Sequence, residues 1–66
     1  MKTIRVDDAS ATVTYVGEAA IGMDESSPFW QIKKLETIGT VLTITWADGN
    51  EEYDNIWASR AGLTYI

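Results

Sequence analysis

The chain has 66 residues, one proline, no cysteine and no histidine, and its formal net charge at pH 7 is -5. Disulfides are therefore excluded, and a structural zinc site is not expected. Because a chain of this length can bury only a small hydrophobic core, we expect its stability to depend on a partner or on copies of itself. The excess of acidic groups disfavours nucleic acid, and no apolar run is long enough for a membrane span or a secretory signal. We expect a soluble protein made in the cytoplasm.

Two strands are predicted in the first part of the chain. Residues 2–6 alternate polar and apolar side chains, with Ile4 and Val6 on one face, which is the period of a half-buried strand. Residues 7–10 then form a turn, and residues 11–16 form the second strand.

A long loop is predicted next, over residues 17–28. This segment has two glycines, an Asp-Glu-Ser-Ser cluster and the only proline. Loops of such length often carry function or form interfaces, and a flexible connector is the alternative.

The firmest local prediction is a hairpin made of residues 29–37 and 40–47. Ile38 and Gly39 between them have the length of a tight loop. We expect the apolar face of the first strand, which includes Trp30, to coincide with that of the second. The expected core consists of Val13, Tyr15, Trp30, Ile32, Leu42, Ile44, Trp46, Ile56 and Leu63.

The last part of the chain begins with a second turn signal, Asp48-Gly49. It predicts a short strand over residues 51–54, then one or two helical turns over residues 55–60 and a last strand over residues 62–66. The fold class is therefore all-β: one domain over residues 1–66, a small antiparallel meander of four to five strands forming a compact sandwich or open barrel, with a short helical turn near the C-terminus.

Catalysis is not expected from this inventory of side chains. Histidine and cysteine are absent, and neighbouring carboxylates such as Asp7-Asp8 point to opposite faces of a strand. Residues 48–54 resemble the start of a calcium loop, but Tyr53 stands where such a loop needs glycine. No enzyme activity, cofactor or metal site is expected.

The aromatic residues allow two interpretations. Trp30 and Trp46 are expected in the core, whereas Trp57, together with Arg60, fits a core position and an exposed binding patch equally well. The doublet Lys33-Lys34 is expected to protect an edge or to pair with carboxylates. The residues expected to form a protein interface are Ile21, Met23, Phe29, Tyr53, Trp57 and Arg60.

Four segments of the chain together resemble small, mostly uncharacterised virion-associated proteins of tailed bacteriophages. They begin with Tyr15-Val16-Gly17 and continue through residues 30–34, 45–50 and 53–65, and the most specific part pairs Trp-Ala-Asp-Gly-Asn with the closing Asp-Asn-Ile-Trp stretch. The resemblance implies an accessory structural protein that decorates the capsid or sits at the head-tail or fibre apparatus. It also implies a location in the virion after synthesis in the bacterial cytoplasm, and contacts with capsid, portal or tail proteins in many symmetric copies. It assigns no catalytic residue.

Other functions remain open from the sequence. A non-virion phage protein that inhibits a host protein is one alternative, and a carbohydrate-binding tip module that uses the aromatic side chains is another. A designed miniprotein is disfavoured by the irregular loop at residues 17–28.

Overall fold

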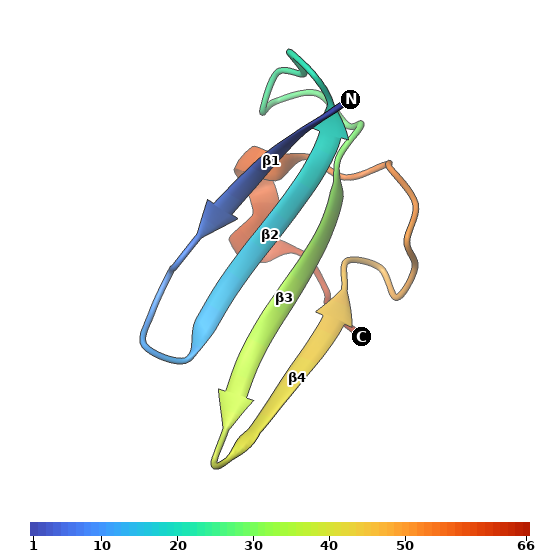
Figure 1. Cartoon of the computed structure of the whole chain (residues 1–66). Helices are drawn as coiled ribbons and strands as arrows, with labels where there is room; N and C mark the ends of the chain where they lie inside the picture. The colour runs from blue at the N-terminus through green and yellow to red at the C-terminus, as the bar shows by residue number, and fades with distance from the viewer.

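The computed structural model describes all 66 residues and contains one antiparallel sheet (Figure 1). Its four strands are β1 (Lys2–Asp7), β2 (Val13–Ala20), β3 (Gln31–Ile38) and β4 (Val41–Trp46), paired in chain order as a meander. A 3-10 helix, η1 (Trp57–Gly62), lies behind the sheet in the view of Figure 1. The expected all-β meander with a short helical turn is confirmed, and the sheet does not close into a barrel. The helix is far too short to cross a membrane.

The strand expected over residues 51–54 is not formed, because the C-terminus occupies the edge of β4 that it would need, and the strand expected over residues 62–66 is reduced to an isolated bridge. Asp48 and Gly49 have φ values of 59° and 72°, as a type I′ turn requires. The amide of Asp48 nevertheless donates to the Thr64 carbonyl at 2.8 Å, and Trp46 exchanges two hydrogen bonds with Ile66. Residues 51–54 therefore form no strand, and the C-terminal segment contributes only one isolated bridge, between Ala47 and Tyr65.

The hairpin between β3 and β4 determines which side chains share a face of the sheet. Its two-residue loop is Gly39-Thr40, one position later than expected, with Ile38 paired to Val41 and Gly39 at φ 63°. Such a loop pairs even-numbered positions on one strand with odd-numbered positions on the other, and paired residues point to the same side. Trp46 pairs with Lys33 and therefore lies on the opposite face from Ile32.

The face towards η1, here called the covered face, holds the core. Arg5, Gly17 and Ile32 form one row across it. Gly17 leaves room for the ring of Trp57, whose centroid lies 5.8 Å from that of Trp30. The buried core consists of Ala19, Trp30, Ile32, Ala47 and Trp57.

Four of the expected core residues are confirmed. Trp30 and Ile32 are buried, and Tyr15 and Leu63 are partly buried against them. The core therefore lies on the covered face, as the apolar pattern of Trp30 and Ile32 in the first strand of the hairpin predicted.

The expected core positions on β4 were wrong. Leu42 and Ile44 are 56% and 50% exposed, because the hairpin register turns them away from the covered face. Val13, Trp46 and Ile56 are half-buried and lie outside the core cluster. A single buried layer remains, filled mainly by two tryptophans.

Tyr65 attaches the C-terminus to this layer. Its ring centroid lies 5.6 Å from that of Tyr15, and its hydroxyl donates a hydrogen bond of 2.8 Å to the Arg60 carbonyl. Burial raises the pKa of Tyr65 to about 12, and the neighbouring Tyr15 adds to the shift.

Gly17→Ala tests the fit of Trp57 on β2. A Cβ at this position would lie 2.7 Å from Trp57 Cζ3 and 3.2 Å from Trp30 Cε3. We expect the unfolding free energy in urea to fall by about 1–3 kcal/mol, the usual cost of overpacking. Gly62→Ala is the control, since a Cβ there meets no atom within 4 Å. Equal stability of the two variants would contradict this packing.

The raised pKa of Tyr65 predicts a loss of stability in alkali. The unfolded chain ionises its tyrosines near pH 10, whereas folded Tyr65 stays protonated to about pH 12. Its contribution is therefore complete below about pH 10 and declines as the pH rises through about 12. Urea unfolding at increasing pH is expected to show a shallower decline for Tyr65→Phe than for the unsubstituted chain, and parallel declines would count against it.

Candidate functional site

The face of the sheet opposite η1, here called the open face, is the candidate functional surface. It faces the viewer in Figure 1, and no other part of the chain lies across its centre. The strand register brings apolar side chains from all four strands to it. These residues are Ile4, Val6, Val16, Leu35, Leu42, Ile44 and Trp46.

These side chains are most exposed on the two edge strands, β1 and β4. Ile4 and Val6 are 58% and 66% exposed, and Leu42 and Ile44 are exposed by half or more. Contiguous apolar patches that remain in contact with water mark interaction sites on soluble proteins. The open face therefore provides a surface for binding another apolar surface.

The apolar side chains form two patches at opposite sides of the open face. One lies over β1 and β2 and the other over β3 and β4. Lys33 separates them, in a row that runs Val6, Val16, Lys33, Trp46 across the sheet. Its Nζ atom lies 5.4 Å from the centre of the Trp46 ring, a cation–π contact that keeps the ammonium over an apolar surface.

Polar side chains form the rim of the open face near the start of β1. The Tyr53 hydroxyl donates a hydrogen bond of 2.7 Å to Glu18 Oε2, and Lys2 Nζ lies 4.4 Å from the centre of the Tyr53 ring. The hydrogen bond to the carboxylate raises the pKa of Tyr53. Below this rim is a shallow hollow of about 130 Å³, lined by Ile4, Val16, Glu18, Gln31 and Lys33.

The open face differs in charge from the rest of the molecule. Among its strand positions, Lys2 and Lys33 are basic and Glu18 is acidic, so the face carries a formal charge of +1. Because the whole chain carries -5, the remainder carries -6. Glu18 is the only acidic side chain at a strand position of the open face, and the acidic segment 51–54 borders this face, where Gln31 Nε2 donates to the Glu51 carbonyl at 2.9 Å.

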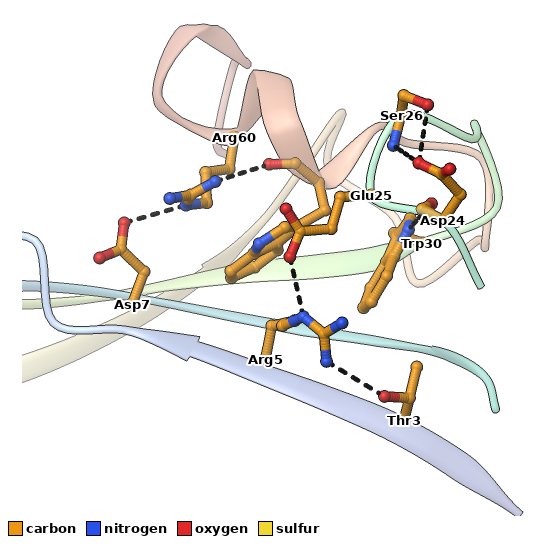
Figure 2. A network of polar contacts seen from close by, with 9 residues as sticks. Thr3, Arg5, Asp7, Asp24, Glu25, Ser26, Trp30 and Arg60 are labelled. Carbon is orange, nitrogen blue, oxygen red and sulfur yellow. Dashed lines mark hydrogen bonds and ion pairs between the residues drawn. The ribbon is translucent and has the colours of Figure 1, made fainter. Parts of the chain in front are cut away.

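Trp57 and Arg60, two of the expected interface residues, make contacts within the chain that hold η1 on the sheet. Trp57 is only 3% exposed, so its interpretation as part of an exposed patch was wrong. The Arg60 guanidinium lies 4.5 Å from the centre of the Trp57 ring. It donates 2.9 Å and 3.1 Å hydrogen bonds to Asp7 Oδ2 and the Trp57 carbonyl (Figure 2).

The structure separates the other four expected interface residues. Ile21 and Phe29 are exposed in the loop between β2 and β3, and Met23 in the same loop is half-buried against the core. Tyr53 alone reaches the rim of the open face, through its bond to Glu18. The expected interface is therefore not one continuous surface.

The loop between β2 and β3 is held to the sheet by the hydrogen bonds drawn in Figure 2, and to η1 by a further backbone bond. The Trp30 indole donates to the Asp24 carbonyl at 2.9 Å, and Arg5 Nε donates to Glu25 Oε2 at 2.9 Å. The amide of Ala58 in η1 donates to the Glu25 carbonyl at 3.0 Å. This loop covers the edge of the core and is more than a connector.

The acidic and serine cluster in that loop has a structural role. The Asp24 carboxylate accepts bonds of 2.8 Å from both the amide and the hydroxyl of Ser26, an Asx-type turn. These bonds lower the pKa of Asp24, and the bond from the backbone amide has the larger effect.

The lysine doublet was expected to protect an edge or to pair with carboxylates. Lys34 Nζ lies 3.6 Å from Glu36 Oε1 on the covered face, and Lys33 lies on the open face.

The sequence analysis missed the open face because it assigned the apolar residues of β4 to the core. The signal that could have found it is the length of the β3–β4 loop. A loop of two residues places Trp30 and Trp46, both even-numbered, on opposite faces.

No group of three acidic side chains is placed to hold a metal ion. A scan against models of protein families found no match, and neither did searches of curated proteins and of solved structures.

Glu18→Gln tests the rim of the open face. The carboxylate charge and its hydrogen bond hold the Tyr53 phenol in its neutral form, so their removal is expected to lower the Tyr53 pKa towards 10. The measurement is an alkaline titration of phenolate absorbance, with Tyr53→Phe identifying the Tyr53 component. Glu52→Gln is the control, since Glu52 is exposed in the same segment as Tyr53. An unchanged Tyr53 midpoint in Glu18→Gln would contradict the contact.

Proposed function

We propose that this protein is an accessory structural component of a tailed-phage virion and acts through protein–protein contacts. The observation that carries the proposal is the open face, where apolar residues such as Val6, Leu42 and Ile44 are exposed by half or more. A particle protein meets neighbouring subunits at high local concentration, and these can cover such a surface. The resemblance of residues 15–65 to virion-associated proteins supports the same assignment.

The proposed partners are capsid, portal or tail proteins of the particle, contacted by many copies of this chain. The acidic surface away from the open face favours a protein environment over contact with the packaged genome, because DNA phosphates repel it. A position on the outside of the head, or at the head-tail or fibre apparatus, agrees with this charge.

The carbohydrate-binding alternative loses its tryptophans, because Trp30 and Trp57 are buried and Lys33 lies over Trp46. The exposed rings are those of Phe29 and Tyr53, and they lie on different segments. Inhibition of a host protein would also use an apolar surface, and it is the alternative that the following experiment separates.

The experiment is immunoblotting and mass spectrometry of gradient-purified particles of the phage that encodes the chain. We expect the protein in the particles at a fixed stoichiometry to the major capsid protein. Ile44→Lys, on the open face, is expected to reduce incorporation at least tenfold, whereas Ile38→Lys, at a residue 65% exposed on the other side, is expected to leave it unchanged. A protein present in infected-cell lysate and absent from particles would refute the virion assignment.

A further inference from the structure

The open face lacks the second layer that small domains normally place over an apolar sheet. The covered face already uses η1 and its five buried apolar residues, and this is a small core for a chain without disulfides. We propose that a second copy of this chain covers the open face, so that two sheets stack into a two-fold symmetric sandwich. The inference rests on the proposed function and makes it more specific, because it names a second copy of this chain as the neighbouring subunit that covers the open face.

Charge favours a second copy through this face over one through the acidic loops. Two chains that each carry -5 repel one another, and the repulsion is strongest where the surfaces that carry -6 meet. The open face carries only +1 and contains both signs, at Lys2, Glu18 and Lys33. Stacking the open faces places the acidic surfaces of both copies outward, towards water.

The area of the open face is sufficient for a reversible dimer. Four strands spaced about 4.8 Å apart, with about six residues of about 3.4 Å each, give a face of about 19 Å by 20 Å. Two such faces cover about 760 Å² in plan, which is the size of a weak and reversible contact. We therefore expect a dissociation constant in the micromolar range or weaker.

The two apolar patches are arranged so that the face is complementary to itself. A two-fold axis parallel to the strands, between β2 and β3, places the β1–β2 patch of each copy over the β3–β4 patch of the other. Val6 and Trp46 lie in the same row of the sheet and therefore face each other across the interface. Aligned sandwiches of this kind keep the two sheets about 10 Å apart.

The same axis matches the charges on the face. Lys33 of each copy lies over the row of Val16 in the other copy, next to the row that contains Glu18. The ammonium of one copy can therefore approach the carboxylate of the other at the edge of the hollow.

The first experiment is sedimentation equilibrium of the full chain over a range of concentrations. We expect the mass to rise from 7.3 kDa towards twice that value as the concentration passes through the micromolar range. Ile4→Lys and Ile44→Lys are each expected to weaken dimerisation at least tenfold. Ile38→Lys is the matched control, since it introduces the same charge at an exposed isoleucine on the opposite side of the sheet. Far-ultraviolet circular dichroism confirms that each variant is folded.

The second experiment maps the interface by cross-linking and does not depend on a disruptive variant. Because the chain has no cysteine, one can be introduced cleanly by Val6→Cys in one sample and by Ile44→Cys in another. A short bismaleimide is expected to join the mixed chains into a covalent pair. The control mixture of Val6→Cys with Ile38→Cys is expected to give at least tenfold less product.

The outcomes separate this inference from the proposed function. A chain that stays monomeric at millimolar concentration, or Ile38→Lys weakening the dimer as much as Ile44→Lys, overturns the second copy on the open face. Incorporation into particles by a monomeric chain overturns this inference alone. A dimer that maps to the open face but is absent from particles overturns the virion assignment alone.

Discussion

The pairing of β3 with β4 through a two-residue loop is the constraint on which the rest of the structure depends. It places Ile32 on one side of the sheet and the apolar side chains of β4, Leu42, Ile44 and Trp46, on the other. The apolar residues of β4 therefore contribute almost nothing to the internal core. One register decides both how small the core is and where the exposed apolar surface lies.

On the covered side, a small number of close contacts compensates for the small core. Gly17 has no side chain, so the Trp57 ring lies directly on β2 and against Trp30. Arg60 lies over the outer side of that ring and is hydrogen-bonded to Asp7 on β1. The helix that carries both residues is only six residues long and stays in place because its side chains are held by the sheet.

The same division of the sheet separates charge from apolar surface. Except for Glu18, the acidic groups lie in the loops or on the covered side of the sheet, where Asp7 and the loop residue Glu25 bind arginines of the chain itself. The open face keeps a nearly balanced charge beside its apolar side chains. This distribution of charge disfavours contacts through the acidic surface and agrees with the proposed protein contact through the open face.

The sequence by itself determined most of the local elements of this protein. Alternating side chains predicted the four strands of the sheet, and Gly39 and the Asp48-Gly49 pair marked both turns, because positive φ angles restrict the residues that fit. The prediction was wrong for residues 17–20, which continue β2 instead of beginning the loop, and for the two strands expected after β4. Only the tertiary structure decided which apolar face became the core, that Trp57 fills the space over Gly17, and that the C-terminus takes the edge of β4. These depend on contacts between residues far apart in the chain, and local periodicity carries no information about them. That Trp30 and Trp46 lie on opposite faces follows from the length of the β3–β4 loop, but which of the two faces η1 covers is decided by the tertiary structure.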